Sequence, residues 1–312
     1  MRRNESLRER IGYLQYSSME RVATTWPPRL AGMLFRVYGW GTFRFIEESR
    51  KIVAANLSRV LERPPDSELV QAATREAFAL YARYWFDTFR LGVMPPEEIT
   101  KLFHVDDLEN IDNALENGKG AILALPHLGN WDAAGYFLCV KGYRLAAVAE
   151  RLSSVRVFEL FLRHRQELGM RIVPLDNVQR VGPQLAQLLA ENWLVALVAD
   201  RDLTGRGVDV EMFGATRKLP AGPALLSLST GSPLLVCPVY STDDGWTCRI
   251  GRPLVIEKTG EMRQDVTTLT RKLAAEFERA IAAKPVDWHM FQPAWPGGPV
   301  AEHARAESTP LS

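Results

Sequence analysis

The stretch AILALPHLGNWD, residues 121–132, decides the fold of this chain of 312 residues. Its first five residues are apolar, which is typical of a strand buried on both faces of a parallel sheet. Asn130 is a favourable N-cap, so we expect a helix from there to about residue 141. The stretch therefore predicts a strand, a short loop that carries His127, and a helix whose first turn contains Asp132.

The same order of elements repeats along the rest of the chain. Apolar runs bounded by glycine, proline and polar residues predict further strands, and the longer runs between them predict helices. We expect strands near residues 120–126, 145–149, 171–174, 194–199 and 234–240, helices near 130–141, 154–168, 178–191 and 262–283, and a hairpin around residues 243–245. This alternation predicts an α/β fold: a three-layer αβα sandwich with a mostly parallel central sheet.

A helical region precedes this alternating pattern. Proline pairs punctuate it and separate the expected helices. We interpret residues 1–100 as a helical N-terminal segment that is integral to a single domain, 101–296 as the α/β core, and 297–312 as a flexible tail of small and polar residues.

The N-terminal fifth of the chain is basic, although the net charge is only +1. Residues 1–63 contain twelve Arg or Lys and six Glu, against 26 basic and 31 acidic residues in the remainder. Basic and aromatic side chains are mixed there: Arg29, Arg36, Arg44, Trp26, Tyr38, Trp40, Phe43 and Phe45. This mixture suits an anionic lipid surface, with arginines on phosphates and rings at headgroup depth. The alternative is a solvated helix whose aromatic side chains pack on the core.

Several classes of protein are excluded by the sequence. Residues 219–242 carry no charge, but prolines and glycines interrupt them, so we expect no transmembrane helix. No apolar run follows Arg2 and Arg3, as a secretory signal would require. The three cysteines show neither paired nor zinc-type spacing, which indicates a reducing compartment and no metal site. We find no glycine motif for a nucleotide and expect no nucleic-acid partner.

His127 and Asp132 have the residue types of a general base and the acid that orients it. An imidazole titrates near neutral pH, and a carboxylate can fix its tautomer and stabilise the imidazolium. On one continuous helix, a spacing of five residues would place the two side chains about 140° apart. The hypothesis therefore depends on the strand, loop and helix, and its alternative is a capping or core histidine.

The spacing of His127 and Asp132 after a strand resembles the glycerolipid acyltransferase signature, including its lipid A late-acyltransferase branch. Further segments carry the resemblance: Glu150-Arg151, 163–170, 199–202, Phe213-Gly214, 219–224 and 288–292. Together they resemble the phosphatidylinositol mannoside acyltransferases over roughly residues 10–295. The resemblance implies an enzyme that moves a long, palmitoyl-like chain from acyl-CoA to a mannose hydroxyl of a phosphatidylinositol mannoside. It also implies a peripheral protein at the cytoplasmic face of the plasma membrane, without metal or cofactor.

The resemblance also implies roles for particular residues. His127, Asp132 and Asp202 would be catalytic, and the residues that bind substrate would be Glu150, Arg165, Asp200, Arg201 and His289. Apart from the resemblance, a basic group made of Arg206, Arg217 and Lys218 is a candidate contact for the phosphates of coenzyme A. The apolar segments 33–46 and 70–91 are candidates to line an acyl groove, with these aromatic side chains as its walls: Phe78, Tyr81, Tyr84, Trp85 and Phe89. The alternatives are surface ion pairs for the charged residues and ordinary core packing for His289 and the aromatic rings.

Two other functions remain open at this point. One is a related glycolipid acyltransferase of the lipid A late-acyltransferase type, which acceptor profiling would distinguish. The other is a non-catalytic lipid-binding protein in which the histidine is structural, and which would bind liposomes without acyl transfer.

Overall fold

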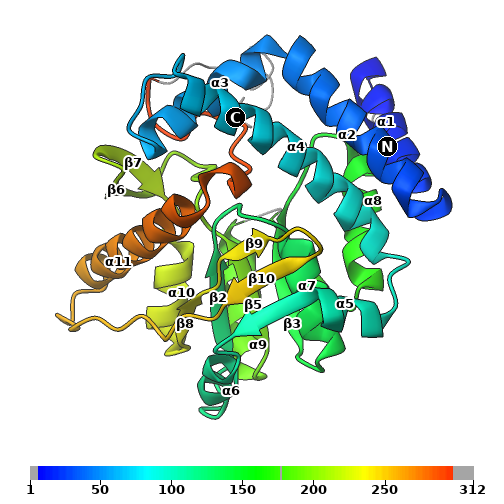
Figure 1. Cartoon of the computed structure of the whole chain (residues 1–312). Coiled ribbons are helices and arrows are strands. Elements are labelled where there is room, and N and C mark those ends of the chain that lie inside the picture. Colours follow the sequence, from blue (N-terminus) through cyan, green and yellow to red (C-terminus); the bar gives the residue numbers. More distant parts are fainter. Residues whose placement is uncertain (1–5, 176–177, 298–312) are drawn as a thin grey trace.

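The computed structural model describes residues 6–175 and 178–297, and Figure 1 shows the arrangement of its elements. The helices are α1 (Leu7–Thr25), α2 (Pro28–Phe45), α3 (Glu47–Val60), α4 (Glu68–Leu91), α5 (Pro96–Leu102), α6 (Glu109–Leu115), α7 (Trp131–Val140), α8 (Val155–Glu167), α9 (Val178–Ala190), α10 (Gly222–Thr230), α11 (Met262–Ala283) and the short 3-10 helix η1 (Pro285–Asp287). The strands are β1 (Phe103–Asp106), β2 (Ala121–Leu125), β3 (Leu145–Glu150), β4 (Arg171–Leu175), β5 (Leu194–Val198), β6 (Val208–Met212), β7 (Ala215–Leu219), β8 (Leu234–Val236), β9 (Val239–Ser241) and β10 (Trp246–Arg249). The predicted tail lies, from residue 298 on, outside the described residues.

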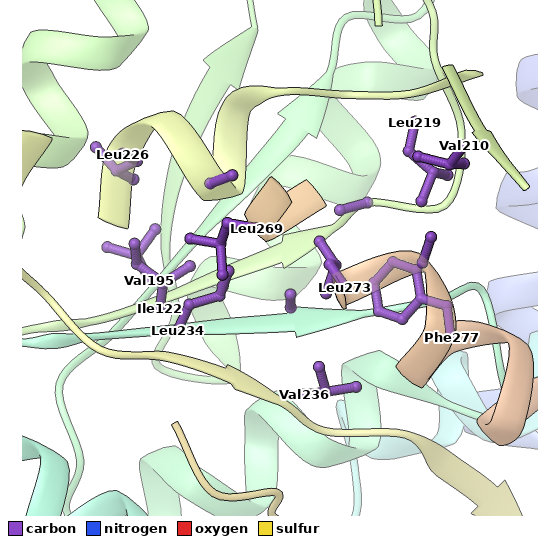
Figure 2. Packing of buried hydrophobic residues seen from close by; sticks show 14 of the residues in the cluster. Ile122, Val195, Val210, Leu219, Leu226, Leu234, Val236, Leu269, Leu273 and Phe277 are labelled. Carbon is purple, nitrogen blue, oxygen red and sulfur yellow. The ribbon is translucent and has the colours of Figure 1, made fainter. Parts of the chain in front are cut away.

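The central sheet has five parallel strands in the order β4-β3-β5-β2-β8. Strand β2 is buried along its whole length, as its unbroken apolar run predicts. Helices α9, α10 and α11 cover one face and contribute to one apolar cluster, part of which Figure 2 shows around Ile122, Val195 and Leu273. Helix α7 covers the other face and contributes to a second cluster. The predicted three-layer α/β fold is confirmed.

The expected strand at 234–240 is in fact two strands that belong to different sheets. Strand β8 pairs with β2, whereas β9 pairs with β10 in a smaller sheet of order β1-β10-β9. Pro238 lies between the two strands and has no N–H to donate to a ladder, so the chain can leave the first sheet there. The hairpin expected around residues 243–245 is present between β9 and β10.

The N-terminal helices lie across the end of the central sheet at which its strands finish (Figure 1). Helix α4 is the longest of them and packs on α1, α2 and α3. Its aromatic side chains face the loops that follow β2 and the residues after η1. In the described part of the chain, we find no helix that is both long enough and apolar enough to cross a membrane.

Candidate active site

Three neighbouring strands of the central sheet end at one edge and bring polar side chains together. His127 follows β2, Glu150 ends β3, and Asp200 and Arg201 follow β5. The carboxyl edge of an open α/β sheet is where such folds bind ligands. A cavity of about 820 Å³ lies there, and His127, Glu150 and Arg201 are part of its wall.

The loop that carries His127 is held in place by two other segments. Asn130 caps α7, because its side chain accepts a hydrogen bond from the backbone of Ala133 at 2.9 Å. Gly129 has a φ of +56°, and a Cβ atom there would lie 2.5 Å from the backbone oxygen of Val239. The backbone N–H of His289 donates to the carbonyl of His127 at 2.8 Å. These contacts fix the direction in which the imidazole leaves the loop.

The imidazole of His127 is paired with Asp200. Its Nδ1 atom contacts Oδ1 of Asp200, and its backbone N–H donates to Oδ2 at 3.1 Å. The indole Nε1 of Trp288 also donates to Oδ2, at 2.8 Å, and a guanidinium nitrogen of Arg217 donates to the backbone oxygen of Asp200 at 2.5 Å. Asp200 is fully buried, whereas 18% of the His127 side chain is exposed. The carboxylate is thus held rigidly while the ring still reaches the cavity.

The electrostatic environment keeps Asp200 ionised. Burial alone would raise the pKa of this carboxyl. The charge and hydrogen bond of His127, the hydrogen bond from Trp288 and the charge of Arg217 outweigh burial and hold the pKa well below its usual range. An ionised carboxylate at Nδ1 leaves Nε2 as the basic atom of a neutral imidazole.

Asp132 does not take the position that the sequence predicts for it. Its two oxygens accept hydrogen bonds from Arg165, with Nε to Oδ1 at 2.6 Å and a terminal nitrogen to Oδ2 at 3.2 Å. The hydroxyl of Tyr84 donates to Oδ2 at 3.0 Å. Burial would raise the pKa of Asp132, but the charge of Arg165 keeps it below the usual value. The predicted contact of Asp132 with His127 is therefore corrected: the first turn of α7 directs this carboxylate to the guanidinium on α8.

The roles expected of Asp202 and Asp200 are also changed by the geometry. The carboxylate of Asp202 accepts hydrogen bonds from the backbone N–H groups of Thr204 and Gly207, at 3.0 and 2.7 Å. It thereby stabilises the loop after β5 and is not part of the cavity wall. Asp200, expected to bind substrate, is the residue that contacts the histidine. On an extended chain, two acids separated by one residue would point to the same side, so their different environments reflect the bend of the chain at Asp200 after β5 has ended.

Glu150 and Arg201 lie beside each other in the cavity wall and form an ion pair. A guanidinium nitrogen of Arg201 lies 3.8 Å from a carboxylate oxygen of Glu150, whose side chain is half exposed. Both groups remain able to contact a polar ligand. Arg165 is also part of the cavity wall, but two of its nitrogens donate to Asp132, so its expected pairing with a substrate phosphate stays a prediction.

His289 lies inside the cavity wall, next to the histidine of the loop. Its ring lies 5.3 Å from that of Tyr81 and 5.4 Å from that of Tyr84, measured between ring centroids. Burial, and after it the charge of His127, lowers the pKa of His289 to about 3, so this imidazole is neutral. Its two ring nitrogens are buried and have no hydrogen-bond partner among the described residues.

The expected basic group does not exist as one surface. Arg217 is 4% exposed, and its guanidinium lies 5.8 Å from the ring of Trp288 and 5.2 Å from that of Trp295. Lys218 forms an ion pair with Asp209 at 3.0 Å, and Arg206 is exposed. Alternate residues of β7 point to opposite sides, so Arg217 faces the core while its neighbour faces water.

The structure places three of the five expected aromatic wall residues at the cavity. Tyr81, Tyr84 and Trp85 contribute to its wall. Phe78 and Phe89 are buried in two separate clusters of the N-terminal helices. Within the described part of the chain, no group of three or more His, Cys, Asp or Glu side chains could hold a metal ion.

The sequence does not reveal two features of the site: the hydrogen bond from Trp288 to Asp200, and the contact of Asp200 with His127 in place of the expected contact with substrate. A signal for Asp200 was available, because it follows the strand that pairs with β2 and so ends at the same edge. No comparable signal existed for Trp288, which reaches the site through an isolated bridge to Leu128.

Comparison with known proteins shows the family to which the chain belongs. The family described as bacterial lipid A biosynthesis acyltransferase matches residues 5–296. The chain therefore belongs to this family of acyltransferases, as its resemblance predicts.

Three curated proteins that are similar to this chain share one more specific name. The chain is 39% identical over 241 residues to the phosphatidylinositol mannoside acyltransferase of Mycolicibacterium smegmatis, covering 77% of each chain. It is 36% identical over 298 residues to the protein of the same name from Mycobacterium tuberculosis (strain CDC 1551 / Oshkosh), covering 89% of this chain and 90% of the relative. The protein of that name from strain H37Rv is 35% identical over 298 residues, with the same coverage.

Proposed function

We propose that this protein transfers a long fatty acyl chain from acyl-CoA to a mannose hydroxyl of a phosphatidylinositol mannoside. The names of its relatives support the acceptor. The observation that carries the chemistry is the pair of His127 and Asp200 at the edge of a largely apolar cavity. A base beside an apolar chamber suits the attack of a hydroxyl on an acyl thioester.

The geometry supports a direct transfer with one general base. Nε2 of His127 takes the proton of the mannose hydroxyl as its oxygen attacks the thioester carbonyl carbon. The tetrahedral intermediate then collapses, the carbon–sulfur bond breaks, and the imidazolium returns the proton to the departing CoA thiolate. Asp200 holds the ring and stabilises the imidazolium during both steps. Such a base contributes about 10²- to 10⁴-fold to the rate.

The acceptor sugar would be held by the polar groups around the base. Glu150 can accept hydrogen bonds from sugar hydroxyls, and Arg201 can donate to them or to a phosphate. The uncharged ring of His289 forms part of the cavity wall close to the same point. Asp132 and Arg165 would act as positioning residues, because Asp132 accepts a hydrogen bond from Tyr84 in the cavity wall and is itself held by Arg165.

The exposed face of α2 supports peripheral binding to an anionic membrane, which we place at the cytoplasmic face of the plasma membrane. Large apolar side chains form a stripe at helical spacing on this face: Leu30, Met33, Leu34, Val37 and Tyr38. Arg29, Arg36 and Arg44 are exposed on the same helix. Replacing these three arginines with Gln should weaken binding to anionic vesicles by about 1 kcal/mol per charge.

The matched control replaces the exposed Arg249, Arg263 and Arg279, which lie on other elements, with Gln. Both triple variants lose the same charge, so only a membrane face on α2 makes the first bind more weakly than the second. Equal binding of the two variants at low salt would rule out this face.

The activity is tested by transfer of radiolabelled palmitate from palmitoyl-CoA. Phosphatidylinositol mono- and dimannosides, a lipid A precursor and a sample without acceptor are assayed in parallel. We expect label on the mannosides, and a loss of at least about 10²-fold in His127→Ala. Label on the lipid A precursor alone would favour the related lipid A type of acyltransferase. No label and no release of CoA above buffer would favour a lipid-binding protein.

A further inference from the structure

The central strand of the five-stranded sheet is more exposed than a strand in the middle of a sheet usually is. Strand β5 lies at the centre of the five strands, yet Ala196, Leu197 and Val198 are all partly exposed. Successive residues of a strand point to opposite faces. Open space therefore lies on both faces of β5, and all three residues are part of the wall of the cavity at the candidate active site.

The cavity thus has two lobes, which meet at the edge that carries His127. The closed lobe lies on the face covered by α7, and its wall contains buried residues: Leu123, Gly135, Leu145, Met170, Cys237 and Cys248. The open lobe lies between α9 and α10, and its rim is exposed: Gly182, Pro183, Gly222, Leu225 and Ser229. The two lobes together have a volume of about 820 Å³.

Small residues on the sheet make the room in the closed lobe. Ala147 of β3 and Ala196 of β5 are direct partners in the ladder, and both belong to the cavity wall. Gly135 of α7 lies opposite the sheet, where a Cβ atom would be 2.5 Å from Sδ of Met170. Helix α7 therefore packs closely against Met170 at one end of the lobe. The methyl groups of Ala147 and Ala196 form the sheet side of the space that remains.

The alanine pair lies deep in the lobe. Ala147 comes three residues before Glu150, and Ala196 comes four residues before Asp200. At about 3.3 Å per residue, the pair lies roughly 10 to 13 Å along the strands from the polar edge. A long acyl chain that starts at His127 and runs into the lobe must pass over these two methyl groups, whereas a short chain ends before them.

We propose that Ala147 and Ala196 set the length of the acyl chain that this enzyme accepts, by keeping the far part of the closed lobe open. The proposal rests on the proposed function, because it assigns the closed lobe to the acyl group of the donor. The closed lobe suits an alkyl chain better than the open lobe does, because most of its wall consists of buried apolar residues, whereas the rim of the open lobe is exposed to water.

The test replaces each alanine with leucine and compares donors of two lengths. In Ala147→Leu and Ala196→Leu, we expect the ratio of transfer rates with palmitoyl-CoA and decanoyl-CoA to fall at least about tenfold, because room for one methylene is worth about 10- to 200-fold. The matched control is Ala186→Leu on α9, which adds the same side chain to the wall of the open lobe. This control should keep the ratio of the unmodified protein.

Two results would overturn the proposal. One is an unchanged ratio in both sheet variants while circular dichroism shows them folded. The other is a fall in the ratio for Ala186→Leu alone, which would put the acyl chain in the open lobe. Ala147→Val and Ala196→Val add less volume and suit a strand, so they replace the leucine variants if those fail to fold.

A binding measurement separates this proposal from the proposed function. Displacement of a fluorescent fatty acid by decanoate and by palmitate needs neither an acceptor nor transfer. We expect Ala196→Leu to lose affinity for palmitate at least about tenfold more than affinity for decanoate. If no acceptor is labelled but this difference is found, the proposed transfer fails and the role of the alanine pair stands. Equal losses for the two acids would refute the alanine pair even in an active enzyme.

Discussion

Asp132 and Asp200 are two buried carboxylates at the same edge of one sheet, and their partners differ in whether they can release a proton. Asp132 is held by Arg165, a permanent cation, with two hydrogen bonds. Asp200 is held by His127, whose ring can gain and lose a proton. The first pair can stabilise the fold but has no proton to give at neutral pH, whereas the second pair can take part in proton transfer. In the proposed mechanism, it is the partner of each carboxylate, rather than its burial, that distinguishes the role of Asp200 from that of Asp132.

The largest effect on transfer, after loss of the histidine itself, is expected from Asp200→Asn. An amide at this position can stabilise the wrong tautomer of His127 and does not stabilise its cation, so the transfer rate should fall by about 10²- to 10⁴-fold. The measurement is the initial rate of acyl transfer at pH 7, with the exposed Asp209→Asn as control. A fall of less than about threefold would show that Asp200 does not assist the base.

Asp132→Asn should act mainly on stability. It leaves the Arg165 cation without its carboxylate in a buried site, which typically costs about 3–5 kcal/mol in the free energy of unfolding. Urea unfolding at pH 7 measures this loss, and Asp132→Asn combined with Arg165→Met should recover part of it. Transfer per folded molecule should fall less than in Asp200→Asn. If Asp132→Asn lowered transfer per folded molecule more than Asp200→Asn does, Asp132 rather than Asp200 would be the carboxylate that assists the base.

His289 extends the comparison to a histidine that lacks a carboxylate. Its pKa is about 3 in the folded protein, well below the ordinary value of an unfolded chain. The unfolded state therefore binds the proton first, and stability is lost as the pH falls from about 6.5 towards 3. Between pH 7 and pH 5 the loss should be about 2 kcal/mol. Urea unfolding of His289→Phe at both pH values should show a smaller loss, and an unchanged loss would mean that the buried ring does not cause it.

The smallest effect is expected from Asp202→Asn. This carboxylate accepts hydrogen bonds within its own loop, and an amide oxygen can keep part of them. Transfer should therefore change less than about threefold. A loss as large as that of Asp200→Asn would restore the catalytic role that the sequence suggests for Asp202.

Local patterns predicted the elements of the core well, because each depends on its own residues. The apolar run of β2, the N-cap at Asn130 and the amphipathic helix α11 were all expected close to where they lie. The small sheet was not expected. Its strands β1 and β10 pair in parallel although they are more than a hundred residues apart, and no local pattern reports such a pairing.

The site shows the same division. The position of His127 at the end of a strand follows from residues 121–130 alone. Its partner lies 73 residues further along the chain and reaches it through the pairing of β2 with β5. The near carboxylate, Asp132, was the natural choice from spacing, but α8 supplies an arginine that binds it more completely.

By itself, the sequence determined the α/β class, the histidine at the edge of the sheet and the family to which the chain belongs. These features could be predicted because apolar periodicity, helix caps and motifs are local properties of the chain. Only the tertiary structure decided which carboxylate faces His127, that Arg217 is buried against tryptophans, and that open space lies on both faces of β5. These features depend on which strands are neighbours and on which side chains meet across layers. Both arise when distant segments pack together, so no stretch of the sequence contains them alone.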